Sequence, residues 1–180
     1  MTTIRKTPIP DSYWLVEGVL LAGEYPATSD EAGTRVKLTK FLNAGIRTFV
    51  DLTERRDGLT DYDRVLGELS QERGIETRHL RFGIRDLGIP HDETLTKHVL
   101  SAIRDEIAAG RPVYVHCWGG VGRTGTMVGC WLVEQGKTGP EALERIAELR
   151  KPTSDGARRS PETEAQRRYV CEWIGPLTRT

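Results

Sequence analysis

The sequence has little cysteine, with only Cys117, Cys130 and Cys171 among 180 residues. An odd and sparse set of thiols is poor material for a disulfide framework and suits a reducing compartment. The four histidines are His79, His91, His98 and His116. None is spaced with a cysteine as the ligands of a zinc site would be, so the sequence predicts neither a metal site nor a cofactor.

Long apolar runs and an excess of either charge are also missing. No run approaches the roughly 18 apolar residues of a membrane span, and the first ten residues contain no apolar signal core. Lys and Arg total 26, as do Asp and Glu, so the formal net charge is zero. Nothing therefore predicts a nucleic-acid or membrane partner, and any attraction for anions must be local. We expect a soluble, cytoplasmic monomer.

The length suits one domain, without repeats, low-complexity tracts or a linker. We expect an extended lead-in over residues 1–12 and one domain over residues 13–175. Hydrophobic patterns and turn residues predict strands over 13–16, 19–22, 46–52, 75–82 and 113–116. They predict helices over about 30–43, 61–73, 92–109, 123–134, 141–150 and 161–174. In the first helix Val36 is expected to face the core, and Pro161 is expected to open the last helix. Alternating strands and helices indicate a mostly parallel sheet with helices on its faces.

The most informative stretch covers residues 113–125, Val-Tyr-Val-His-Cys-Trp-Gly-Gly-Val-Gly-Arg-Thr-Gly. A β-branched run is followed by a glycine-rich loop and then by a helical pattern. Glycines allow backbone N–H groups to turn inward, and such a nest at a helix N-terminus binds a tetrahedral oxyanion. The planar fork of Arg123 can hold two oxygens at once. The expected substrate-binding loop comprises Trp118, Gly119, Gly120, Val121, Gly122 and Arg123, and phosphate, sulfate or vanadate would fit it.

Cys117 is the expected nucleophile of this loop. A thiol ordinarily has a pKa of about 8.5, and a helix N-terminus favours the thiolate. Cys117 lies just before a predicted helix start, which indicates displacement at phosphorus through a cysteinyl-phosphate. Thr124 is expected to donate a hydrogen bond to the sulfur and help it leave. His116 is expected to organise the loop and bias the thiolate rather than to transfer protons.

A phosphate ester also needs a proton for its leaving oxygen. Asp86 is the best candidate, because it lies in a loop with two glycines and a proline after a predicted strand. Asp51 and Asp92 are its rivals, although Asp92 resembles a helix cap. A turn-forming role is the alternative for Asp86.

The motif His116-Cys117-(five residues)-Arg123-Thr124-Gly125 matches the signature of the cysteine-dependent protein tyrosine phosphatase superfamily. The loop 84–90 resembles the dual-specificity branch, and the Trp-Gly-Gly-Val-Gly filling is similar to that of kinase-associated phosphatases and their bacterial relatives. The resemblance covers roughly residues 13–174. It implies a three-layer α/β domain with a four- or five-stranded sheet, a two-step metal-independent mechanism, and inhibition by vanadate or by cysteine oxidation.

A weaker resemblance covers Ser160-Pro161-Glu162-Thr163 with Gln166. In related enzymes this segment positions the hydrolytic water, although position 162 is Glu here where many relatives carry Gln. The alternative for Gln166 is an ordinary exposed helix residue. For Arg158 and Arg159 a solvated basic loop and a substrate clamp both remain open.

The leading function is hydrolysis of phosphotyrosine in proteins, with phosphoserine and phosphothreonine left open. A small phosphoester is also an acceptable substrate. An inositol phosphate or phosphoinositide phosphatase is the alternative, but lysines between Cys117 and Arg123, common in such relatives, are absent. A module that binds phosphoproteins without catalysis, a rhodanese-like sulfur-transfer loop and a glycine turn with a buried cysteine are the remaining readings.

Overall fold

The computed structural model describes residues 6–175. Its sheet contains β1 (Ser12–Val16), β2 (Leu20–Gly23), β3 (Thr48–Asp51), β4 (Arg78–Arg81) and β5 (Val113–His116). The strand order is β1-β2-β5-β3-β4. β1 pairs with β2 antiparallel, and all other neighbours are parallel. The predicted mostly parallel sheet is confirmed.

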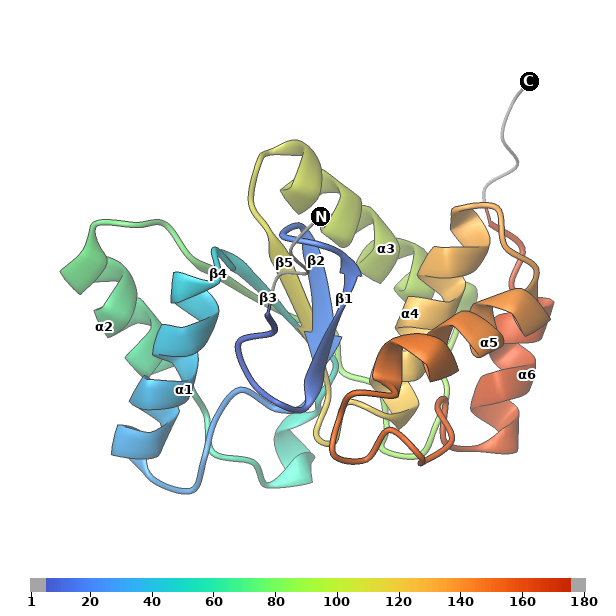
Figure 1. Cartoon of the computed structure of the whole chain (residues 1–180), viewed down its shortest axis with the longest axis horizontal. Helices are drawn as coiled ribbons and strands as arrows, with labels where there is room; N and C mark the ends of the chain where they lie inside the picture. Colours follow the sequence, from blue (N-terminus) through green and yellow to red (C-terminus); the bar gives the residue numbers. More distant parts are fainter. Residues whose placement is uncertain (1–5, 176–180) are drawn as a thin grey trace.

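Helices cover both faces of the sheet and give three layers (Figure 1). On one face lie α1 (Glu31–Asn43) and α2 (Asp63–Arg73). On the other lie α3 (Glu93–Ala108), α4 (Gly122–Glu134), α5 (Gly139–Arg150) and α6 (Glu164–Glu172). Among the described residues, no helix is long and apolar enough to cross a membrane.

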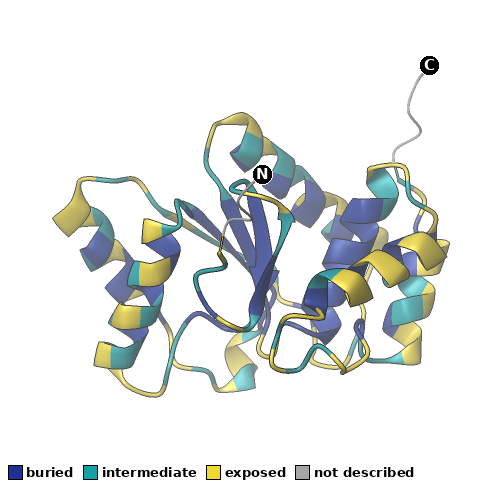
Figure 2. Ribbon diagram, viewed as in Figure 1, coloured by how far each residue is buried: buried dark blue, intermediate teal, exposed yellow. Residues whose placement is uncertain are grey.

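The core is divided by the sheet, because successive strand residues point to opposite faces. Val113 and Val115 of β5 belong to the cluster that includes residues of α3–α6. Tyr114, between them, belongs to the cluster with residues of α1 and α2. All of β5 is buried, as a central strand covered on both faces should be (Figure 2).

The strand register brings the loops of the site together. His116, at the end of β5, is level with Gly23 of β2 and with Asp51 of β3. The carboxyl ends of the parallel strands therefore meet at one edge of the sheet, where α/β proteins form their binding crevices. The loops that follow β2, β3, β4 and β5 all start there.

Three expectations about the elements were wrong in detail. β3 begins at Thr48 rather than at Ile46, because the Ile46 N–H bonds the Phe41 carbonyl and closes the end of α1. Val36 is 59% exposed. The last helix begins at Glu164 rather than at Pro161, since the Thr163 side chain caps it.

The lead-in of residues 1–12 also packs more closely than expected. Residues 1–5 lie outside the described part of the chain. Ile9 is buried against the cluster beneath α1 and α2, and the Asp11 carboxylate accepts a hydrogen bond from the Ser154 N–H at 2.9 Å. Residues 9–12 are therefore part of the domain.

Candidate active site

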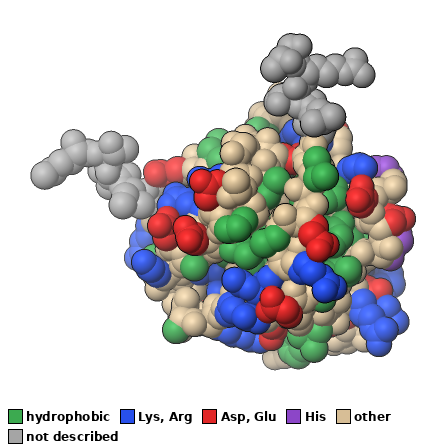
Figure 3. Space-filling model, turned by 90° about the vertical axis from the view of Figure 1, so that its right-hand side faces the viewer, with side chains coloured by type: hydrophobic (Ala, Val, Ile, Leu, Met, Phe, Trp, Pro, Cys, Tyr) green, Lys and Arg blue, Asp and Glu red, His purple; other side chains and the backbone are tan. Residues whose placement is uncertain are grey.

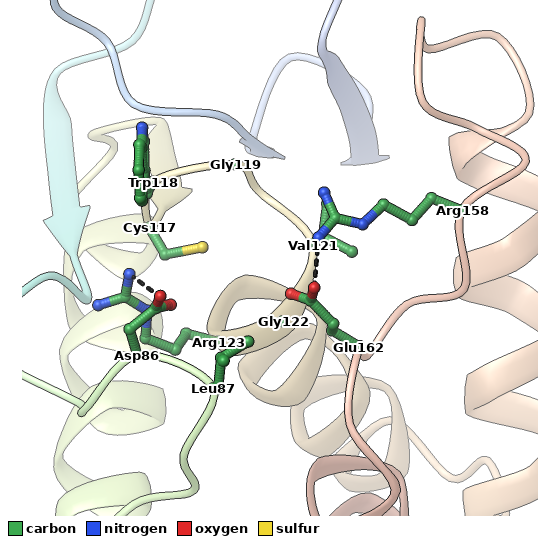
Figure 4. A pocket seen from close by; sticks show the side chains of 10 residues that line it. All are labelled: Asp86, Leu87, Cys117, Trp118, Gly119, Val121, Gly122, Arg123, Arg158 and Glu162. Atoms are coloured by element: carbon green, nitrogen blue, oxygen red, sulfur yellow. Dashed lines mark hydrogen bonds and ion pairs between the residues drawn. The ribbon is translucent and has the colours of Figure 1, made fainter.

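A cavity of about 270 Å³ opens at the carboxyl edge of the sheet (Figure 4). Its lining comes from three loops: the one between β5 and α4, the one after β4, and the one before α6. The lining residues are Asp86, Leu87, Cys117, Trp118, Gly119, Val121, Gly122, Arg123, Arg158 and Glu162. The structure thus brings the expected oxyanion loop, Cys117, Arg123 and Asp86 to one place.

Backbone carbonyls of the glycine-rich loop are held by donors outside it. The bonds run from His116 Nδ1 to Cys117 O (3.2 Å), from Tyr25 N to Trp118 O (2.7 Å) and from Ser160 Oγ to Val121 O (2.7 Å). In a planar trans peptide the N–H points opposite to the C=O. The N–H groups of Gly119 and Gly122, which line the cavity, consequently point away from these donors and are available to an oxyanion.

Two glycines of the motif are required by close approaches. Gly120 has φ +69°, and a Cβ there would lie 2.4 Å from the carbonyl carbon of Gly23. At Gly125 a Cβ would lie 2.3 Å from Ser160 Oγ, the donor that holds the Val121 carbonyl. Either side chain would displace backbone that shapes the loop.

The guanidinium of Arg123 lies at the base of the cavity, and its side chain is only 1% exposed. Nη1 donates to Asp57 Oδ2 at 2.5 Å and to Ile84 O at 3.1 Å. Within residues 6–175, Nε and Nη2 are buried without a hydrogen-bond partner. Burial lowers the pKa of Arg123, but Cys117 and Asp57 more than offset this and raise it, so the group stays charged. The Nε donor is therefore free for an anion, whereas Nη2 forms an ion pair with Asp86 Oδ1 at 3.0 Å and becomes available where an anion displaces that carboxylate.

Asp57 contacts Arg123, which was not foreseen from the sequence. Its carboxylate accepts from Nη1 and fixes one side of the Arg123 guanidinium. The position of Asp57 could have indicated this contact. Asp57 follows the predicted strand 46–52 by a few residues, and α/β proteins form their sites at the carboxyl ends of such parallel strands. Only the adjacency of β3 and β5 brings it to Arg123.

His116 is fully buried and hydrogen-bonded at both ring nitrogens, with Nε2 2.7 Å from the Tyr62 hydroxyl and Nδ1 3.2 Å from the Cys117 carbonyl. The carbonyl can only accept, so Nδ1 carries the proton and Nε2 accepts from Tyr62. Burial lowers the pKa of His116 to about 4 and raises that of Tyr62 well above its usual value. A neutral imidazole thus anchors the loop, in line with the organising role expected for it.

The buried His116 makes stability depend on pH. Its pKa falls from 6.5 to about 4 on folding, so between these values the unfolded chain binds more protons. We expect the free energy of unfolding to decrease by roughly 3 kcal/mol as the pH falls through this window. Denaturant unfolding of the wild type and of His116→Gln should show the slope in the first protein only. Equal slopes in both proteins would contradict the assignment.

Thr124 does not make the expected bond to the sulfur in this structure. Its hydroxyl is buried and has no hydrogen-bond partner within residues 6–175. Cys117 is 3% exposed and lines the cavity. The contact between the two side chains stays a prediction for the substrate-bound protein.

Asp86 faces Arg123 across the cavity, with Oδ1 3.0 Å from Nη2 and about half of its side chain exposed (Figure 4). Its rivals are engaged elsewhere. Asp51 is fully buried and accepts from His79 at 2.9 Å; burial raises its pKa, but hydrogen bonds led by that from His79 lower it below the usual range. Asp92 caps α3 by accepting from the Leu95 N–H at 2.8 Å. Of the three, only Asp86 lines the cavity.

Gln166 is not the exposed helix residue that was one of its two readings, because it is 0% exposed. Its Oε1 accepts from the N–H groups of Glu162 and Thr163, and its Nε2 donates to the Gly88 carbonyl at 2.9 Å. It lies behind Gly122, where a Cβ would be 3.0 Å from Nε2. The water-positioning role stays a prediction.

Two charged residues, Arg158 and Glu162, also line the cavity. Arg158 is a cavity residue rather than part of a purely solvated loop, and it forms an ion pair with Glu162 (Figure 4). The Oε2 of Glu162 would be 3.3 Å from a Cβ at Gly122. The wall opposite Asp86 thus carries a neutralised charge pair. At the cavity mouth, Trp118 and Leu87 are 59% and 56% exposed.

Fold and site define a phosphatase of the dual-specificity and protein tyrosine phosphatase class. The family model described as "Swiss Army Knife protein, DSP-PTPase phosphatase domain" matches residues 10–172. The chain belongs to this family, as its motif resemblance indicated.

Curated relatives include enzymes with lipid names. The human "Phosphatidylglycerophosphatase and protein-tyrosine phosphatase 1" is 31% identical over 145 residues, which cover 78% of this chain and 65% of that protein. "Phosphatidylinositol 3,4,5-trisphosphate 3-phosphatase and protein-tyrosine-phosphatase PTEN1" of Arabidopsis thaliana is 44% identical over 64 residues, or 36% of this chain and 15% of that protein. The chain thus spans less than two thirds of either.

Solved structures share the fold. Tk-PTP in its active form is 24% identical with a TM-score of 0.67, covering 92% of this chain and 99% of its own. Kinase associated phosphatase with its catalytic-site cysteine substituted by serine is 20% identical with a TM-score of 0.67, covering 92% and 94%. PTPMT1 in complex with PI(5)P is 22% identical with a TM-score of 0.65, covering 89% and 93%.

Proposed function

We propose that this phosphatase hydrolyses phosphotyrosine in proteins through a cysteinyl-phosphate, with phosphoserine and phosphothreonine as slower substrates. The observation that carries this proposal is the base of the cavity. There Cys117, the buried guanidinium of Arg123 with its Nε unpartnered in the described chain, and Asp86, which lies 3.0 Å from Nη2, share one small space. A phosphoryl group bound there meets a nucleophile, a cation and a proton donor together.

In the first step the Cys117 thiolate attacks phosphorus, so that an S–P bond forms while the P–O bond to the leaving group breaks. The loop N–H groups and Arg123 hold the three equatorial oxygens. Asp86 transfers its proton to the leaving oxygen. The bound dianion competes with Asp86 for Arg123, which frees the Asp86 carboxyl group to face the leaving oxygen.

In the second step water attacks the phosphocysteine and Asp86, now a carboxylate, takes the proton of that water. An O–P bond forms, the S–P bond breaks, and the thiolate of Cys117 is restored. The buried Thr124 hydroxyl, which has no other partner in the described chain, can then donate to the departing sulfur.

The charge of the cavity favours a single phosphoester over a polyphosphorylated headgroup. Besides Arg123, the only cation among its lining residues is Arg158, which is paired with Glu162. A second phosphate would have to displace that carboxylate. Trp118 and Leu87 instead offer apolar surface to an aromatic ring.

A lipid phosphate monoester is the second candidate. The observation favouring it is the name of the human relative, which combines phosphatidylglycerophosphatase with protein-tyrosine phosphatase. A headgroup with one terminal phosphate would also fit a cavity with a single guanidinium, that of Arg123, at its base.

A substrate panel tests the proposal. We expect kcat/KM for a phosphotyrosine peptide to exceed that for a soluble inositol polyphosphate and for phosphatidylglycerophosphate in micelles by about tenfold or more. Each substrate is measured against Cys117→Ser as the blank. Trp118→Ala should lower kcat/KM for phosphotyrosine more than for phosphoserine. The shorter phosphoserine side chain does not reach Trp118 at the cavity mouth when its phosphate is bound at the base. Faster turnover of phosphatidylglycerophosphate than of any peptide would establish the second candidate instead.

A further inference from the structure

We propose that Gln166 is a positioning residue for Asp86. Its buried amide holds the loop after β4 in the place where Asp86 faces Arg123 and the leaving group. The inference rests on the proposed function, in which Asp86 gives the proton.

The Gln166 side chain connects the start of α6 to this loop through hydrogen bonds at both ends of its amide. Its carboxamide is inaccessible to solvent and does not line the cavity. Oε1 is used by the N–H groups of Thr163 (3.0 Å) and Glu162 (3.1 Å) at the start of α6. Nε2 crosses to the loop and donates to the Gly88 carbonyl at 2.9 Å. This side chain therefore ties the helix end to the loop, together with a longer hydrogen bond from Thr163 Oγ1 to the Leu87 carbonyl at 3.5 Å.

The loop is held on both sides of Asp86. Before it, the Ile84 carbonyl accepts from Arg123 Nη1 at 3.1 Å. After it, the Gly88 carbonyl accepts from Gln166. The Asp86 carboxylate itself is half exposed and forms an ion pair with Arg123. A bound substrate phosphate would compete with Asp86 for Arg123. With the phosphate bound, the backbone anchors are what remain to place the carboxyl group.

The turn at the tip of the loop requires the hydrogen bond from Gln166 to keep its conformation. Residues 85–88 form a turn in which the Gly88 N–H bonds the Arg85 carbonyl at 2.9 Å. Leu87 sits in this turn at φ +60°, a left-handed conformation that is unfavourable for a residue with a Cβ. Removing the bond to Gly88 would let the turn relax and carry Asp86 away from the leaving oxygen.

Gln166 Oε1 completes the capping box at the start of α6, but the rest of α6 is held by contacts with α3 and α4 and can serve as a fixed support. Val170 is fully buried and packs so closely on α4 that a Cβ at Gly129 would be 2.6 Å from its Cγ2. The Tyr169 hydroxyl lies 2.7 Å from Thr96 Oγ1 of α3. Figure 3 shows the side of the molecule, at the right of Figure 1, where α5 and α6 lie. Losing the Nε2 donor of Gln166 should therefore move the loop rather than the body of the helix.

Gln166→Leu tests this assignment, since leucine has a similar size and neither donates nor accepts. A proton donor must be within hydrogen-bond reach of the leaving oxygen, and small misplacements cost large factors in rate. We expect kcat for an alkyl phosphate to fall by about tenfold or more, with kcat for p-nitrophenyl phosphate changed by less than about twofold. KM should change little. In Asp86→Asn, the further substitution Gln166→Leu should add almost nothing, because both act through one proton transfer.

Val170→Ala is the matched control on the same helix. It should lower the melting temperature through lost packing and leave the ratio of alkyl to aryl rates as in the wild type. If Gln166→Leu does not fold, Gln166→Asn shortens the side chain by one methylene and removes the reach to Gly88. A wild-type rate ratio in the folded variant, or full additivity with Asp86→Asn, would overturn the inference. If Asp86→Asn itself leaves the ratio of alkyl to aryl rates unchanged, the proposed role of Asp86 as the acid is wrong, and not only the positioning role of Gln166.

Discussion

Cys117→Ser will reduce turnover of an aryl phosphate by at least about 10⁴-fold, because the hydroxyl keeps its proton where the thiol can lose it. A serine at this position would need a neighbouring base. His116 cannot serve, since one ring nitrogen accepts from Tyr62 and the other donates to the Cys117 carbonyl. Steady-state kinetics with p-nitrophenyl phosphate, with a limit set by the enzyme-free rate, measures the loss.

The same variant separates catalysis from binding. The loop and Arg123 remain, so Cys117→Ser should bind a phosphotyrosine peptide at least as well as the wild type binds phosphate, measured by calorimetry. Substantial residual turnover would exclude the cysteinyl-phosphate mechanism. A wild type that binds the peptide and never hydrolyses it would support the alternative of a non-catalytic phosphoprotein-binding module.

Asp86→Asn has the second-largest expected effect, and that effect depends on the leaving group. General acid catalysis contributes typically 10²–10⁴-fold. We therefore expect an alkyl phosphate to react about 10²-fold or more slowly, whereas p-nitrophenyl phosphate, whose leaving group needs little protonation, slows by less than about tenfold. These quantities come from paired kcat measurements.

Asp57→Asn is the control for this experiment. Asp57 and Asp86 both contact the guanidinium of Arg123, but Asp57 does not line the cavity. Weakening the hold on Arg123 should slow alkyl and aryl substrates by the same factor. Equal slowing of both substrates by Asp86→Asn would assign Asp86 a structural role on Arg123 as well.

The elements were predicted well wherever local signals are strong. The β5 range 113–116 was predicted as observed, because an apolar run there ends at glycines. The end of α2 could also be predicted from a single residue, because Gly74 after it adopts the left-handed conformation that glycine favours. The start of α6 was misplaced, because Pro161 is a typical first helical residue and yet the capping side chain is Thr163. Both signals are local, and the capping box between Thr163 and Gln166 marks the observed start.

The site divides in the same way. Cys117, Arg123 and the glycines between them could be recognised because their whole geometry is contained in one loop between a strand and a helix. Asp86 was found less directly, from its place after a strand. Asp57 and the pairing of Arg158 with Glu162 were not foreseen, since they depend on which loops are neighbours in space.

The amino-acid sequence alone therefore determined the α/β class and the family, and it placed the expected nucleophile Cys117 and Arg123 in one glycine-rich loop. Short-range spacing is sufficient there, because each requirement concerns residues within one turn of helix or one strand. Only the tertiary structure decided that Asp57 fixes Arg123 and that Gln166 is buried against the loop of Asp86. The physical reason is the strand order β2-β5-β3-β4, which gathers distant loops at one edge of the sheet. Hydrophobic periodicity within each strand does not encode that order.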